Sequence, residues 1–435
     1  MSGESCARLV YAVQNITDYV HAVLGERCLT TSIVAPTVVV YVLILILGLF
    51  GNICTCTVIA RNSSMHNPTN YYLFSLAISD LLILVMGLPM ELHDVLDSAY
   101  PYKFGVLVCK LRAFVVEFTS YASILTISAF TIERWVAICF PLKLRVCLSL
   151  DRVFKVIGIA WAIAFAAALP MAFIVKVNRI ALPVADDSEQ SWTRLVSNDG
   201  ATIMNTDFCA MDIERPRAQK LLIYFAFTAF FLMPAILITV AYCHIGIQLR
   251  TADRYLSQSD NFGKTTRARK SVIQILVSVV VSFFLCWLPF HLQRLLSISL
   301  AESGGDVNPA LQTLFTSVFY ISGCCYYSNS ACNPIIYNIL SEKYRRAFLK
   351  TIFGKTLSKR LFGLRGSVNM EPTRSQCRAH PGSPISYKDS SSGGRSIARL
   401  SLASKANRAP SAVIPRHSSS GNDPGSSATY LHVPV

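Results

Sequence analysis

Charge is scarce in this sequence of 435 residues. Only 15% of the residues are Asp, Glu, Lys or Arg, whereas 52% are hydrophobic. A disordered chain needs low hydrophobicity, and a soluble domain carries about a quarter charged residues. The composition therefore excludes a disordered polymer, argues against one large soluble domain and favours a protein that sits in lipid.

Acidic residues are the scarcer kind of charge, with 25 Asp and Glu against 40 Lys and Arg. A basic excess can indicate a nucleic-acid partner, but here its position along the chain matters more. The basic residues gather in every second loop between apolar stretches and in the C-terminal tail, and the alternate loops are acidic. Because cytoplasmic loops of membrane proteins are rich in Lys and Arg, this pattern indicates an extracellular N-terminus, a cytoplasmic C-terminus and no nucleic acid.

Long apolar stretches are abundant, and a bilayer-spanning helix needs about 20 such residues. Seven stretches qualify: 33–60, 71–92, 107–140, 153–175, 221–249, 272–300 and 311–340. The prediction is an all-α plasma-membrane protein, with an extracellular tail (1–32) and a seven-transmembrane helix bundle (33–340). A short amphipathic eighth helix (341–352) and a disordered cytoplasmic tail (353–435) follow. The first 32 residues lack the apolar core of a cleavable signal peptide, so the first span is expected to direct insertion.

The expected outer side has features of an oxidising compartment. Cys109 and Cys209 both lie on that side, which makes a disulfide between them plausible. Cys6 and Cys28 are either a second pair or two free thiols. Asn15 begins an Asn-Ile-Thr glycosylation sequon that also falls outside.

Several polar or rigid residues inside the spans need a reason. Asp80 lies within the second span, and a buried charge there is a functional hypothesis by default. Neutral oxygens from other spans complete either an allosteric sodium site or a hydrogen-bonded network without an ion. The candidates are Ser123, Asn329, Asn333 and Asn52. No other metal or cofactor is expected.

Two further patterns indicate a switch. Glu133 and Arg134 end the third span on the inner side, where an ion pair can form and be released, although simple snorkelling of the charges is the alternative. In the sixth span Phe284 and Trp287 precede Pro289, which removes a backbone hydrogen bond and kinks the helix. Such a kink can serve as a pivot, or Trp287 can simply be packed.

Taken together, these motifs resemble those of the rhodopsin-like (class A) G-protein-coupled receptors, from residue 33 to about 352. The resemblance is carried by Gly51-Asn52, Leu76-Ala77 with Asp80, Cys109 with Cys209, Glu133-Arg134-Trp135, Trp161, Pro234 with Tyr242, Cys286-Trp287-Leu288-Pro289, and Asn333-Pro334-Ile335-Ile336-Tyr337. Trp135 departs from the family pattern, which has Tyr at that place, and so changes a hydrogen bond near Arg134.

The subfamily can be narrowed by single positions. Val116 stands where amine receptors carry Asp, and Tyr327 stands where opsins carry the retinal-binding Lys. Residues 68–92, and Phe290 and His291 followed by Arg294, are similar to the neuromedin U and pyrokinin receptors. The divergent Trp135 and the unusual second outer loop favour an invertebrate member of this group. The alternative within this group is a ghrelin-, motilin- or neurotensin-like peptide receptor.

Spacing predicts where the ligand binds. Glu91 lies eleven residues after Asp80, about three helical turns or ~16 Å further out. Glu117 and Arg294 lie at a similar outer level, among the side chains His291, Phe290, Tyr121, Tyr320 and Tyr327. Buried acids need a cation, and either Arg294 supplies it internally or the ligand brings an arginine. The resemblance implies an amidated peptide that ends in Pro-Arg and one further residue.

The resemblance also implies how the signal passes inward. Arg134 is expected to leave Glu133 and reach towards Tyr242 and Tyr337, which opens a cleft for a Gq-like heterotrimeric G protein. Arg134, Pro141 and Leu142 are its expected contacts. Arrestin and kinases are further candidate partners of the tail, and the amphipathic helix should lie on membrane lipid. A transporter would show internal repeats, and an enzyme a catalytic motif such as HExxH or GxSxG; the sequence contains neither.

Overall fold

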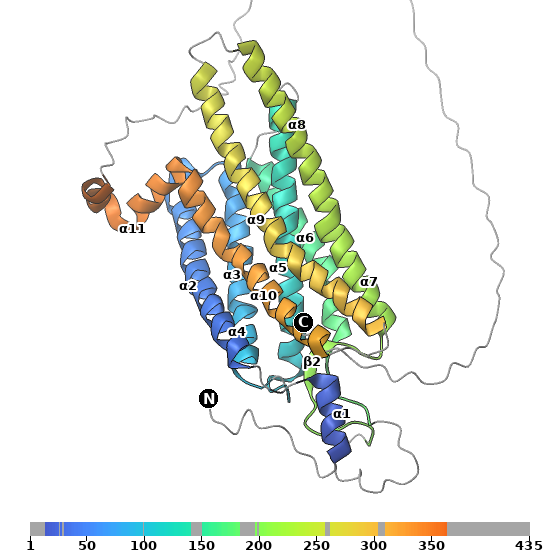
Figure 1. The fold of residues 1–435 in the computed structure, drawn as a ribbon. Helices are drawn as coiled ribbons and strands as arrows, with labels where there is room; N and C mark the ends of the chain where they lie inside the picture. Colours follow the sequence, from blue (N-terminus) through green and yellow to red (C-terminus); the bar gives the residue numbers. More distant parts are fainter. Residues whose placement is uncertain are drawn as a thin grey trace, which may run out of the picture. The chain divides into compact units, whose positions relative to one another are not determined.

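The computed structural model describes residues 14–25, 27, 30–98, 100–140, 150–182, 196–197, 200–256, 262–302 and 309–362. Most of these residues form long helices that run alongside one another (Figure 1). Five of the helices are single segments: α2 (Thr31–Arg61), α5 (Gly105–Cys139), α6 (Leu150–Ile174), α9 (Phe262–Glu302) and α10 (Pro309–Leu340). Two are built from consecutive segments: α3 (Pro68–Met86) with α4 (Leu88–Leu96), and α7 (Pro216–Phe227) with η4 (Thr228–Leu232) and α8 (Met233–Leu256).

Within this described part, six helical segments are long and apolar enough to cross a membrane. They are Thr31–Arg61, Pro68–Leu96, Gly105–Cys139, Leu150–Ile174, Pro216–Thr251 and Val277–Ser299. The seventh member of the bundle is α10, which has 32 residues and carries many Ser, Asn and Tyr residues. The predicted all-α fold with seven membrane helices is confirmed.

The bundle places apolar side chains outside and polar ones inside. On α2, Leu43, Ile46 and Phe50 are each more than half exposed, whereas Asn52 is fully buried. Lipid solvates the outer apolar surface, and buried polar groups must find partners between the helices. This arrangement explains why polar residues within the spans mark the interior.

Several of the breaks and irregular turns in the helices lie at prolines. Pro234 cannot donate a backbone hydrogen bond, and its ring clashes with the carbonyl four residues earlier. The chain adapts through the π-helical turn η4, which ends two residues before Pro234. The second span breaks at Gly87, after which Pro89 lies in the first turn of α4. Pro289 and Pro334 lie inside α9 and α10.

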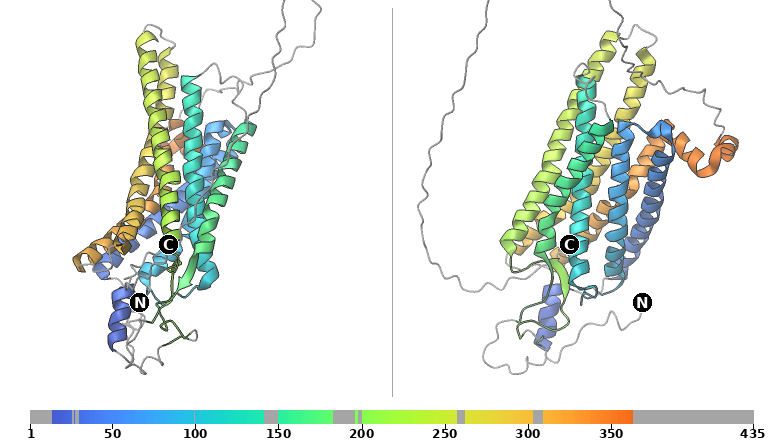
Figure 2. Two further views of the ribbon diagram at one scale, coloured as in Figure 1. Left: turned by 90° about the vertical axis from the view of Figure 1, so that its right-hand side faces the viewer. Right: turned by 180° about the vertical axis from the view of Figure 1, so that it is seen from behind.

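A β-hairpin covers one end of the bundle. Strands β1 (Val175–Asn178) and β2 (Phe208–Met211) pair antiparallel, with Val177 opposite Cys209. Cys209 forms the predicted disulfide with Cys109 at the start of α5. This end, called the hairpin end below, lies opposite the end from which α11 (Glu342–Phe362) extends, called the α11 end (Figures 1 and 2).

Helix α11 runs past the predicted boundary at residue 352. Its backbone bends at Gly354, where φ is +71°, a conformation that favours glycine. Tyr344 anchors the start of the helix, because its hydroxyl donates to the hydroxyl oxygen of Thr55 on α2 at 2.8 Å. Between α2 and α3 lies the short 3₁₀ turn η1 (Ser63–Met65).

Helix α1 (Gln14–Leu24), within the segment predicted as a tail, packs on the hairpin end (Figure 2). Its apolar side chains share a cluster with residues of the connecting loops and β2: Ile16, Val20, Val23, Leu24, Tyr100, Ile180, Ile203, Phe208 and Ala210. The Tyr100 hydroxyl donates to the Gly25 carbonyl at 3.1 Å, and Arg27 Nε donates to the Tyr100 carbonyl at 2.9 Å. Glycosylation of Asn15 remains a prediction, and Cys6 and Cys28 lie outside the described residues.

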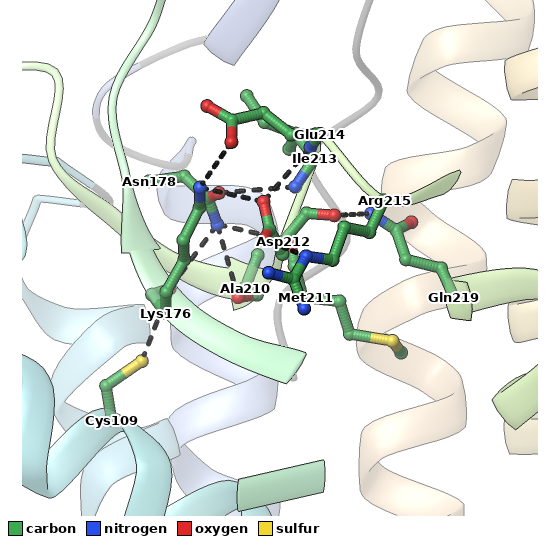
Figure 3. Close-up of polar contacts among 10 residues, drawn as sticks. All are labelled: Cys109, Lys176, Asn178, Ala210, Met211, Asp212, Ile213, Glu214, Arg215 and Gln219. Carbon is green, nitrogen blue, oxygen red and sulfur yellow. Dashed lines mark hydrogen bonds and ion pairs between the residues drawn. The ribbon is translucent and has the colours of Figure 1, made fainter. Parts of the chain in front are cut away.

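A polar cluster fastens the hairpin to the start of α7 (Figure 3). The buried Asn178 side chain donates to the carbonyls of Ala210 and Met211 at 3.2 Å and accepts from the Ile213 N–H at 3.3 Å. Lys176 Nζ lies 2.7 Å from a carboxylate oxygen of Asp212. The chain that leaves β2 is thereby fixed before it enters the bundle.

The charges of this cluster stabilise each other. Burial alone would raise the pKa of Asp212, but hydrogen bonds from Lys176 and from the Glu214 N–H outweigh it, so the pKa lies below its usual 3.8. Burial likewise opposes charge on Lys176, yet its bonds to Asp212 and Glu214 raise its pKa above 10.5. The contribution of Asp212 is therefore present above its unfolded pKa and lost as pH falls through the lower folded value.

Removal of this carboxylate should loosen the hairpin. Asp212→Asn is expected to speed hydrogen exchange of the backbone amides of β2 and the first turn of α7, because the charge-assisted bond to Lys176 is lost. As pH falls through the folded pKa of Asp212, which lies below 3.8, the parent protein should approach the exchange rates of the variant. Exchange read by mass spectrometry checks this, and equal rates in both proteins at pH 7 would contradict the assigned role.

Candidate functional site

Three charged side chains meet between α4 and α5 at the hairpin end. Arg112 donates from Nη2 to Glu91 and from Nη1 to Asp94, the latter at 2.6 Å. The side chains of Arg112 and Glu91 are 6% and 11% exposed, whereas that of Asp94 is 35% exposed. One guanidinium thus serves two carboxylates, and these three residues are called the Glu91 cluster below.

A second ion pair joins α5 to α9. Arg294 Nη1 donates to Glu117, and the two side chains are only 5% and 4% exposed. The guanidinium also lies over the ring of Phe290, with 4.3 Å from its carbon to the ring centroid. Such a cation–π contact adds to the stabilisation of a desolvated guanidinium. This is the internal pairing of Arg294 that the sequence left open as one alternative.

Aromatic side chains surround these ion pairs. His291 is buried against Phe231, with ring centroids 4.8 Å apart, and Tyr121 stacks on Phe230 at 3.8 Å. Tyr327 is buried and packs edge-to-face with Tyr41, with ring centroids 5.8 Å apart. The remaining predicted member of the ligand site, Tyr320, packs against the same core from α10. The helices therefore bring the predicted ligand residues into one region at the hairpin end.

The five residues predicted to hold sodium are all buried: Asp80, Ser123, Asn329, Asn333 and Asn52. Asn333 Nδ2 donates to Asp80 Oδ2 at 2.9 Å, and the Ser123 hydroxyl donates to Ser79 Oγ at 2.9 Å. The Oδ1 atoms of Asn52 and Asn333 are buried without a hydrogen-bond partner among the described residues. One carboxylate and unpaired neutral oxygens suit a sodium ion, so the residues fit the ion, and its binding stays a prediction.

The switch residues lie towards the α11 end. Arg134 Nη2 donates to Glu133 at 2.6 Å, so the predicted local pair is formed. The hydroxyls of Tyr242 and Tyr337 are buried without a hydrogen-bond partner in the described part of the chain. Trp287 stacks on Phe283, with ring centroids 5.0 Å apart. Phe284 contacts Phe231 on the neighbouring η4 segment.

Trp135, the departure from the family pattern, has a specific partner. Its Nε1–H donates to His244 Nδ1 at 2.9 Å and thereby links α5 to α8. Indole nitrogen can only donate, so the imidazole must carry no proton on Nδ1. A tyrosine hydroxyl at position 135 would offer both a donor and an acceptor. The link occurs together with the Glu133–Arg134 pair.

A seven-helix membrane bundle with this disulfide, buried carboxylate network and Glu-Arg pair defines a class of receptor. The family model described as 7 transmembrane receptor (rhodopsin family) matches residues 51–337. The chain belongs to this family, whose members are receptors rather than enzymes.

The particular relatives are peptide-receptor homologues. The chain is 53% identical over 355 residues to the neuromedin U receptor homolog nmur-2 of Caenorhabditis elegans, covering 81% of this chain and 88% of that protein. It is 32% identical to the pyrokinin-1 receptor of Drosophila melanogaster, over 79% and 85% of the two chains. It is 33% identical to neuromedin-U receptor 1 of Rattus norvegicus, over 73% of each chain. The resemblance to neuromedin U and pyrokinin receptors is confirmed.

Sequence reasoning missed Arg112 and Asp94 as members of the site. A signal was available, because Arg112 is a basic residue inside a predicted span, five positions before Glu117. A charge at that depth needs a partner of opposite sign, and Glu91 is an acid at the same level. Pro141 and Leu142, the predicted G-protein contacts, lie outside the described residues.

Loss of Arg112 should destabilise the receptor. Arg112→Met leaves Glu91 buried without a cation, and breaking a buried pair costs about 3 kcal/mol or more. The apparent melting temperature of the purified receptor should fall, and Arg112→Met combined with Glu91→Gln should recover most of the loss. If the double variant is no more stable than Arg112→Met, the pairing is not the source of the effect.

The Trp135–His244 bond should restrain activity without ligand. Trp135→Phe retains an aromatic ring but removes the donor, and a neutral hydrogen bond contributes about 1 kcal/mol. Ligand-independent signalling per receptor at the surface should rise about two- to tenfold if the bond stabilises the arrangement with the Glu133–Arg134 pair. His244→Leu should raise ligand-independent signalling in the same way. Basal signalling at or below the parent level in both variants would reject this role.

Proposed function

We propose that the chain is a receptor for a peptide that ends in Pro-Arg and one amidated residue, and that it activates a Gq-like heterotrimeric G protein. The observation that carries the ligand class is the charge at the hairpin end. There, within the part of the chain that the structure describes, the three carboxylates of Glu91, Asp94 and Glu117 pair with two guanidinium groups, those of Arg112 and Arg294. A surplus carboxylate in a weakly solvated region attracts a cationic ligand.

The arginine of the peptide is drawn to the clusters built on Glu91 and Glu117. Each carboxylate has two oxygens, so it can accept from a second guanidinium while it retains the first. Bidentate pairing would orient the peptide as well as hold it. An amidated C-terminus carries no negative charge, so the carboxylates do not repel it. Arg294 then donates to carbonyl oxygens at that end of the peptide.

Signalling follows as a shift between two populations. The peptide favours the arrangement in which the hairpin-end parts of α7, α9 and α10 draw together. Movement about Trp287, Phe284 and Pro289 opens the α11 end. Arg134 then leaves Glu133 and approaches Tyr242 and Tyr337, whose buried hydroxyls have no hydrogen-bond partner among the described residues. The G protein enters the space that opens beside Arg134.

In this proposal the hairpin end faces the extracellular side of the plasma membrane. The α11 end faces the cytoplasm, where the basic side chains of α11 meet anionic lipid. That orientation agrees with Arg61, the basic last residue of α2 beside α11, and with a disulfide at the other end. Asp80 and its asparagines bind sodium between the two ends. The tail beyond α11 is the place for kinases and arrestin.

A calcium assay with a panel of peptides tests the ligand class. An amidated Pro-Arg-Xaa peptide should activate cells that express the receptor, and its free-acid form should be weaker by about tenfold or more, because a carboxylate is brought near Glu117. Ghrelin-, motilin- and neurotensin-type peptides form the comparison set. A response confined to that set would replace the proposed ligand class.

Receptor variants test the two clusters. Glu91→Gln and Glu117→Gln should each weaken peptide potency by about tenfold or more, because a charge-assisted bond contributes about 1.5–3 kcal/mol. Each variant also removes the internal partner of Arg112 or Arg294, so potencies are compared at equal surface expression, measured with an antibody against an N-terminal tag. If both variants respond like the parent, neither carboxylate meets the ligand.

A further inference from the structure

The two ion-pair clusters differ in charge balance and in access. Glu117 and Arg294 are matched one to one, and less than a tenth of either side chain is exposed. In the Glu91 cluster two carboxylates share one guanidinium, and about a third of the Asp94 side chain is exposed. An added cation is therefore better accommodated at Asp94 than at Glu117, on grounds of both charge and solvent access.

Asp94 also retains hydrogen-bonding capacity. Arg112 Nη1 occupies Oδ2 at 2.6 Å. The other oxygen, Oδ1, lies 3.8 Å from His93 Nδ1, which is beyond hydrogen-bond distance. An ionised carboxylate accepts up to about four hydrogen bonds, so Oδ1 can receive a guanidinium from a ligand.

Arg112 has a hydrogen-bond donor without an acceptor in the described part of the chain. Its side chain is 6% exposed, and its Nε–H is buried with no hydrogen-bond acceptor among the described residues. A buried donor without an acceptor costs about 1–3 kcal/mol, so an acceptor supplied by a ligand or by water would be favoured. The cluster thus offers one acceptor and one donor that its own residues leave open.

We propose that Asp94 and Arg112 together form the docking site for the arginine residue of the peptide. Asp94 accepts from the incoming guanidinium, Arg112 Nε–H donates to a peptide carbonyl oxygen, and Glu91 anchors Arg112 from the buried side. The proposal rests on the proposed function, because it assumes a peptide ligand with an arginine. It narrows that function by making Asp94 a specificity-determining residue and assigning the arginine to the Glu91 cluster.

A double-mutant cycle between receptor and peptide tests this docking site. Citrulline replaces the guanidinium of arginine with a neutral group of nearly the same shape. Asp94→Asn should weaken the potency of the amidated Pro-Arg-Xaa peptide by about tenfold or more. With the citrulline peptide, already weak on the parent receptor, Asp94→Asn should change potency by no more than about twofold.

Two variants provide the controls. Asp97→Asn removes a carboxylate one helical turn away, where Lys103 is its partner, and should shift neither peptide selectively. Asp94→Ser should reproduce the coupling seen for Asp94→Asn, so the result does not depend on one variant that folds well. All potencies are compared at equal surface expression.

The outcomes separate the inference from the function on which it depends. Equal losses for both peptides, or no loss for either, would overturn the role of Asp94 while the proposed ligand class stands. A parent receptor that answers neither Pro-Arg-Xaa-amide nor its citrulline form would overturn the ligand class and the docking site together. Selective loss for the arginine peptide in both Asp94 variants supports the docking site.

Discussion

A buried charge in a membrane bundle must have a partner, and this constraint organises the hairpin end. Glu91 and Glu117 come from different helices, and each is held by an arginine. These ion pairs join α4 to α5 and α5 to α9, so they fix the relative positions of the helices that carry the proposed ligand site. The disulfide from Cys109 to Cys209 then attaches the hairpin to the same α5. In the proposed function, ligand recognition and helix packing therefore depend on the same side chains.

That coupling offers a route from ligand to signal. In the proposed function, a peptide arginine beside the Glu91 cluster changes the contacts between α4 and α5, and α5 also carries Arg134 near its other end. Packed helices have few stable arrangements, so a change at one end can select another arrangement at the other. The Trp135–His244 bond gives this chain an additional restraint between α5 and α8.

The seven spans were predictable because a membrane helix can be recognised in the sequence by its length and hydropathy. The disulfide between Cys109 and Cys209 was predictable from sidedness. Arg112 was missed because spacing gives the level of Glu91 along its own helix but not which side chain of a neighbouring helix faces it. The hairpin and α1 were missed because short strands and a docked terminal helix depend on distant partners such as Tyr100, which no local pattern identifies. The sequence thus located Glu91, Glu117 and Arg294, but not Arg112 and Asp94.

The central claim is that an arginine of the ligand binds beside the Glu91 cluster at the hairpin end. Photo-crosslinking tests it most directly, with an amidated peptide that carries a photoreactive group next to its arginine and mass spectrometry to locate the adduct. The expected adducts lie on α4 and the first turns of α5, near Asp94 and Arg112. Adducts confined to other helices, or found equally with an excess of unlabelled peptide, would contradict it.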